Sequence, residues 1–109
     1  MKQLHIAALA LMLSGAGSAG AAVLGMELDG YVGNAEATIQ ACGKIAPAGT
    51  RRLAEAIAHA VKQEKQTLAA LRKGPGYAKE FKKEAAKWHY MTDKNRSAAC
   101  RKLNDATYP

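Results

Sequence analysis

The chain has 109 residues, 49% of them hydrophobic, with 16 Lys and Arg against nine Asp and Glu, a formal net charge of +7 at pH 7. From this length we expect one small domain. The charge predicts attraction to anionic partners, and the two cysteines allow one intramolecular disulfide.

Residues 1–22 have the composition of a secretory signal peptide. Lys2 supplies a positive start, Leu4–Leu13 form an apolar run, and residues 19–21 (Ala-Gly-Ala) satisfy the small-x-small cleavage rule. The run is much shorter than the roughly 20 residues that span a bilayer, so we expect cleavage near Ala21 rather than a membrane anchor. The expected working protein is residues 23–109, a single helical domain, periplasmic or secreted, with no transmembrane segment after cleavage.

The first predicted helix runs from about Tyr31 or Asn34 to Gly43, which provides a stop. Its apolar residues recur at steps of three and four and therefore share one face: Val32, Ala35, Ile39 and Cys42. Residues 44–49 contain Pro47 and are predicted to form a loop.

The second predicted helix begins after Thr50, whose hydroxyl is in position to cap it, and stops at residues 74–76 (Gly-Pro-Gly). Its apolar residues form one stripe: Leu53, Ile57, Ala60, Val61, Leu68 and Leu71. The segment is rich in Ala, Leu, Gln, Glu and Lys, which favour helix. The short connection predicts an antiparallel hairpin with the next helix.

The third predicted helix starts near Tyr77 and carries a stripe that we expect in the core: Tyr77, Phe81, Ala85 and Trp88. Thr92 and Asp93 are suited to cap a fourth, shorter helix that carries Cys100. The alternative is one continuous helix from Tyr77 to about Asn104. No segment alternates as a strand would, so the predicted fold is all-α, a small bundle of three to four helices.

Cys42 and Cys100 are the only cysteines. Export would bring them into an oxidising compartment, where an even number of cysteines favours disulfides. They lie 58 positions apart, so their bridge would link the first helix to the last. The chain-entropy model gives roughly 4 kcal/mol of stabilisation for a loop of this length.

Basic side chains are concentrated in the second half of the chain. Residues 62–102 hold 12 basic and four acidic side chains, whereas residues 23–61 hold three basic and four acidic. This asymmetry predicts a positive field over one half of the molecule. The candidate anion-binding residues are Lys62, Lys65, Arg72, Lys73, Lys79, Lys82, Lys83 and Lys87. An ordinary solvated helix face is the favoured interpretation of this pattern, since the charges partly interleave with glutamates, and an anion-binding surface is the alternative.

The sequence carries no motif for catalysis or for a cofactor. There is no G-x-S-x-G, no Gly-rich phosphate loop before a helix, and no C-x-x-C or C-x-x-C-H. His59 and His89, even with the nearby Met91, are too isolated to predict a metal site. We therefore predict no catalytic residues, no metal and no cofactor.

The leading functional hypothesis is an exported non-enzymatic domain of the bacterial periplasm that binds another protein. A chaperone, an inhibitor, an immunity protein and an envelope-stress factor all belong to this class. One alternative is a basic binder of anionic envelope lipids or glycans, and another is a secreted toxin or effector. Nucleic acid is a less expected partner in this compartment, and the sequence leaves the oligomeric state open.

Overall fold

The computed structural model describes residues 27–108, and that part of the chain is helical without strands. The elements are α1 (Leu28–Cys42), α2 (Pro47–Gln63), α3 (Leu68–Leu71), α4 (Pro75–Tyr90), α5 (Asp93–Arg101) and a 3-10 helix, η2 (Lys102–Asp105). The predicted all-α class is confirmed, but these residues form five α-helices rather than three or four. The predicted signal peptide lies outside the described residues, and no helix within them is long and apolar enough to cross a membrane.

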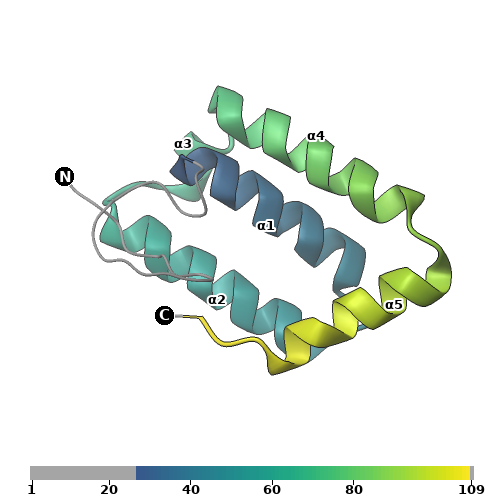
Figure 1. The fold of residues 1–109 in the computed structure, drawn as a ribbon. Helices are drawn as coiled ribbons and strands as arrows, with labels where there is room; N and C mark the ends of the chain where they lie inside the picture. Colours follow the sequence, from purple (N-terminus) through teal and green to yellow (C-terminus); the bar gives the residue numbers. More distant parts are fainter. Residues whose placement is uncertain (1–26, 109) are drawn as a thin grey trace.

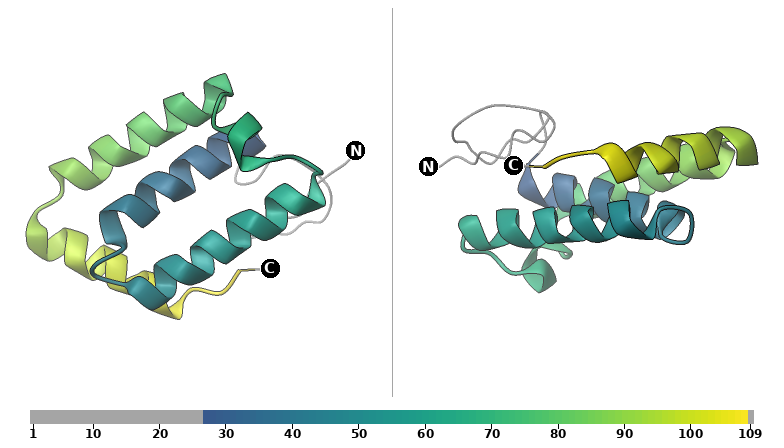
Figure 2. Two further views of the ribbon diagram at one scale, coloured as in Figure 1. Left: turned by 180° about the vertical axis from the view of Figure 1, so that it is seen from behind. Right: turned by 90° about the horizontal axis from the view of Figure 1, so that it is seen from below.

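Helix α1 is the centre of the fold. It lies between α2 and α4, with α3 near its amino-terminal end and α5 near its carboxyl end (Figures 1 and 2). It packs most extensively against α4 and next against α2. The predicted hairpin between the second and third helices is therefore wrong. Residues around most of the circumference of α1 are apolar or small, so two neighbouring helices can cover it from both sides.

The start of α2 differs from the prediction. The helix begins at Pro47, a residue favoured at the first helical position because its missing N–H would have no partner there. Thr50 is consequently one turn inside the helix and does not cap it. Its hydroxyl donates to the carbonyl oxygen of Ala46 at 3.0 Å.

The segment predicted as one long helix is broken into α2 and α3. Helix α2 ends at Gln63, and Lys65 adopts a left-handed conformation with φ of 56°, which turns the chain. Thr67 then caps α3, because its hydroxyl accepts a hydrogen bond of 3.1 Å from the N–H of Ala70. The break allows Leu71 to fold back onto the core that it shares with α1 and α2.

Helices α4 and α5 are separate, so the alternative of one continuous helix is wrong. Helix α4 ends at Tyr90, and the predicted cap at Thr92 is confirmed: its hydroxyl accepts a hydrogen bond of 3.1 Å from the N–H of Asn95. Arg96 holds the corner between the two helices, since its guanidinium donates to the carbonyl oxygens of Trp88 and Met91 at 2.9 and 2.7 Å.

The disulfide between Cys42 and Cys100 joins the last residue of α1 to α5, with an S–S distance of 2.09 Å. The predicted link between the first helix and the last α-helix is confirmed. Both cysteines are fully buried, with Ala46 and Trp88, in a small cluster at this end of the molecule. The bridge therefore ties α5 to the end of the central helix.

The main core lies between α1, α2 and α3 and consists of Leu28, Tyr31, Val32, Ala35, Leu53, Ile57, Ala60, Val61 and Leu71. The stripe expected in the core on α4 is only partly there. Trp88 is buried, whereas Tyr77, Phe81 and Ala85 remain partly exposed. Helix α4 approaches α1 closely through Gly33, where a Cβ would collide with the backbone carbonyl of Tyr77.

Candidate binding groove

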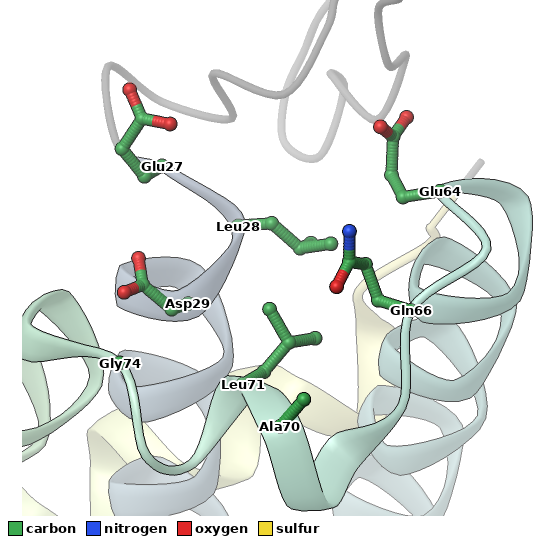
Figure 3. Close-up of a pocket in the computed structure, with 8 residues that line it drawn as sticks. All are labelled: Glu27, Leu28, Asp29, Glu64, Gln66, Ala70, Leu71 and Gly74. Carbon is green, nitrogen blue, oxygen red and sulfur yellow. The ribbon is translucent and has the colours of Figure 1, made fainter.

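An acidic pocket of about 330 Å³ lies where α1 begins and α3 passes beside it (Figure 3). Leu28 and Leu71 both extend into the pocket, and the carboxylates of Glu27 and Glu64 lie on opposite sides of it. Asp29 also lines the pocket, but its carboxylate accepts hydrogen bonds from the N–H groups of Gly30 and Gly76. The acidic groups therefore do not converge on a common point.

A larger groove, of about 500 Å³, opens over α1 between α2 and α4. It is lined by Glu36, Ile39, Gln40, Ala54, Ile57, Leu68, Arg72 and Phe81, most of which are apolar. The fold explains why this groove forms. Helices α2 and α4 flank α1 on both sides, so the side chains of α1 that face neither helix form the floor between them. Its volume is within the range typical of ligand-binding clefts.

A second hollow, of about 250 Å³, continues the groove along the contact between α1 and α4. Gln40 lines both hollows, which makes them neighbours. The residues of the second are Ala37, Gln40, Ala41, Ala85, Trp88, His89 and Arg96. We call the two hollows together the α1 groove.

One wall of the α1 groove contains a cluster of three polar side chains. The Glu36 carboxylate accepts hydrogen bonds from Arg72 Nε at 3.0 Å, from Arg72 Nη2 at 2.6 Å and from the Tyr77 hydroxyl at 2.6 Å. Burial raises the pKa of Glu36, but the hydrogen bonds from Arg72 and Tyr77 outweigh it, so the pKa lies below its ordinary value. Glu36 is therefore ionised at neutral pH and neutralises Arg72.

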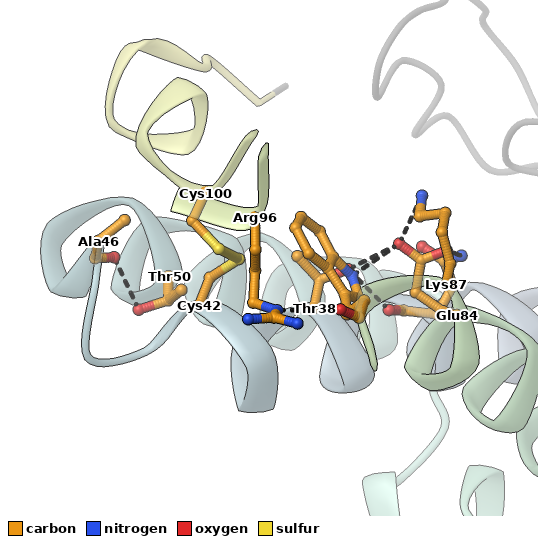
Figure 4. Close-up of a disulfide and its surroundings, with 10 residues drawn as sticks. Thr38, Cys42, Ala46, Thr50, Glu84, Lys87, Arg96 and Cys100 are labelled. Carbon is orange, nitrogen blue, oxygen red and sulfur yellow. Dashed lines mark hydrogen bonds and ion pairs between the residues drawn. A yellow bond between two sulfur atoms is a disulfide. The ribbon is translucent and has the colours of Figure 1, made fainter. Parts of the chain in front are cut away.

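A buried carboxylate fixes α4 against α1 beside the disulfide (Figure 4). Glu84 accepts hydrogen bonds from Asn34 Nδ2 at 3.0 Å, from the Thr38 hydroxyl at 3.2 Å and from Trp88 Nε1 at 3.0 Å. The ammonium group of Lys87 lies 2.9 Å from the same carboxylate. This network, which the sequence prediction missed, determines where the α4 wall of the groove stands. Its signal in the sequence is that Glu84 is four residues before Trp88, on the buried side of the helix.

The eight basic candidates are all exposed. Three form ion pairs: Arg72 with Glu36, Lys83 with Glu80 and Lys87 with Glu84. Within residues 27–108 the other five have no such partner: Lys62, Lys65, Lys73, Lys79 and Lys82. These five come from α2, α4 and the two connections around α3.

His59 and His89 are exposed, and across the described part of the chain no three His, Cys, Asp or Glu side chains are grouped so that they could hold a metal ion. Comparison with protein-family models, with curated proteins and with solved structures finds no significant match to this chain. The case for a function consequently depends on the geometry and charge of the α1 groove.

Proposed function

We propose that the protein is an exported, non-enzymatic helical domain that binds another protein through the α1 groove. The observation that carries the proposal is the groove itself, in which Ile39 and Phe81 are only partly buried although the surrounding surface is concave and mostly apolar. Covering such surface contributes roughly 25 cal/mol for each Å² removed from water. An apolar hollow with polar side chains at its edge is a surface on which a partner can bury apolar side chains.

The rigidity of the groove walls supports this proposal. The Glu84 network fixes α4 to α1, the Glu36–Arg72–Tyr77 cluster ties the segment after α3 to both, and the disulfide holds the far end. A preformed surface loses little conformational entropy when a partner binds, which favours affinity.

The disulfide also supports export, because such bridges persist in oxidising compartments. It agrees with the signal peptide predicted from residues 1–22. In that setting, chaperone, inhibitor, immunity and envelope-stress roles all remain within the proposed class, since each requires binding to another protein.

The test is affinity capture from the exported fraction of the native cell. We compare the wild type with Ala54→Glu, which places a long charged side chain at the groove wall, and with Ala98→Glu, an equal change at an exposed position on α5 that lines neither hollow. We expect the wild type and Ala98→Glu to recover the same partner and Ala54→Glu to lose it. The proposal fails if the wild type recovers no specific partner or if Ala54→Glu retains it.

A second candidate function is binding to anionic envelope lipids or glycans. It is favoured by Lys79 and Lys82, which are exposed on α4 and form no ion pair within the described residues. Binding to lipopolysaccharide or to anionic vesicles should then weaken steeply as salt is added, because exposed charges are screened. The double variant Lys79→Glu/Lys82→Glu should bind least. Salt-independent binding, or none at low salt, removes this candidate.

A further inference from the structure

The α2 side of the α1 groove carries a net positive charge of one. Residues three or four positions apart lie on the same side of a helix. Ala54 lines the groove, and Arg51, Ala58 and Lys62 follow the same spacing on α2, all of them exposed. Glu55 is also near this side, so the α2 edge carries two positive charges and one negative charge.

The α4 side is basic as well. Ala85 and His89 line the groove, and Lys82 precedes them by three and seven residues, which places it on the same side of the helix. Lys83 and Lys87 lie on the other side of α4, where they pair with Glu80 and Glu84. Lys82 is exposed and has no ion-pair partner among the described residues.

The floor of the groove adds no unpaired negative charge. Glu36 is the acidic residue that lines the groove, and the guanidinium of Arg72 neutralises it. Arg51 and Lys62, with Glu55 beside them, therefore lie along one long side of the apolar floor, and Lys82 lies along the other. Charges placed in this way favour a partner that carries negative charge on both flanks of an apolar surface.

The helices on either side of the groove also determine which secondary structure suits a partner. Two helices lie beside α1, so the groove presents rows of helical side chains. Residues 27–108 contain no strand edge to which an extended peptide could add as a further strand. A helix satisfies its own backbone hydrogen bonds and can pack its side-chain ridges into such a groove. A second copy of this chain is less suitable, because it would bring a net positive charge to a positive rim.

We infer that the α1 groove binds an amphipathic helix of another protein, with an apolar ridge on the groove floor and Asp and Glu on both flanks. The inference rests on the proposed function and names the chemistry of its partner. The ridge would contact Ile39, Ile57 and Phe81, and the acidic flanks would face the basic edges of α2 and α4.

The test uses two synthetic helical peptides with the same leucine ridge, one with Glu and one with Lys at the flanking positions. Binding to the full oxidised protein is measured by calorimetry at low salt and at high salt. We expect the Glu peptide to bind at least about tenfold more tightly, with a preference that shrinks as salt is added. Lys82→Glu should weaken binding of the Glu peptide about fivefold or more, whereas its neighbour Lys83→Glu should change it little.

The inference is overturned if neither peptide binds, if the Lys peptide binds as well as the Glu peptide, or if the two lysine variants have equal effects. Circular dichroism tests whether both variants are folded, and Ala54→Glu provides a second variant that should weaken the Glu peptide, because it adds negative charge to the groove wall without changing α4. The capture experiment with Ala54→Glu and Ala98→Glu does not depend on these peptides. Failure of the acidic-helix inference is thus distinguishable from failure of protein binding.

Discussion

The Asp29 carboxylate accepts a hydrogen bond of 3.1 Å from the backbone N–H of Gly76, so the first turn of α1 caps the amino terminus of α4. The cap position of α4 is Gly74, which has no side chain to do this. A Cβ at Gly74 or Gly76 would collide with the Asp29 carboxylate. The Gly-Pro-Gly segment therefore starts the helix and also admits the cap that places it against α1.

Asp29→Ala should lower the free energy of unfolding by about 1 kcal/mol, the usual cost of losing a helix cap. Gly76→Ala should also destabilise the protein, because its methyl group displaces the Asp29 carboxylate. Urea unfolding followed by far-UV circular dichroism measures both. The cost of Gly76→Ala should shrink in the Asp29→Ala background, and an undiminished cost would show that the two residues are not coupled.

Glu84→Ala should be far more damaging than Lys87→Ala. The first leaves the buried N–H of Trp88 and the hydroxyl of Thr38 without their acceptor and should cost about 3 kcal/mol. The second removes only a partly exposed ion pair and should cost less than about 1 kcal/mol. Urea unfolding followed by the fluorescence of Trp88, the only tryptophan, separates the two. Similar costs would contradict the role given to this carboxylate.

The Glu36–Arg72–Tyr77 cluster should make stability depend on pH. Because the pKa of Glu36 is lowered in the folded protein, its ionised form stabilises the fold at neutral pH, and this contribution disappears as the pH falls through the folded pKa. The difference in unfolding free energy between the wild type and Glu36→Gln should be largest near about pH 7 and should close toward about pH 3. Urea unfolding over that range measures it, and a difference that grows on acidification would contradict the assignment.

Reduction of the disulfide should lower the free energy of unfolding by about 4 kcal/mol, since the bridge closes a loop of 58 residues. The double variant Cys42→Ala/Cys100→Ala should resemble the reduced wild type and should not respond to reductant. Urea unfolding with and without reductant gives the comparison. Mass spectrometry of the exported protein should find no free thiol, and two free thiols would rule out the bridge.

Some features could be predicted from the sequence because their signals are local or have one solution. The Thr92 cap depends on residues next to it in the chain, and two cysteines permit a single intramolecular pairing. Helical periodicity likewise identified the buried side of α2, where Leu53 and Ile57 are in the core. Such local signals predict the type of each secondary-structure element and which of its faces is buried.

Other features depend on contacts between distant residues and left no local signal. Lys65 breaks the second helix with a left-handed conformation, although a lysine there gives no warning of a turn. An apolar stripe shows that a face is buried without showing what covers it. The sequence therefore predicts that α2 and α4 pack against each other, whereas both pack against α1. It predicts Phe81 in the core for the same reason, and the place of Phe81 in the groove follows from an arrangement of helices that periodicity does not encode.

Site-specific photo-crosslinking in the exporting cell tests protein binding in the α1 groove most directly. A photoreactive phenylalanine analogue is placed at position 54, on the groove wall, or at position 98, on α5 outside both hollows. We predict that position 54 crosslinks to one defined protein through a helical segment and that position 98 does not. No adduct at position 54, or the same adducts from both positions, would contradict the account.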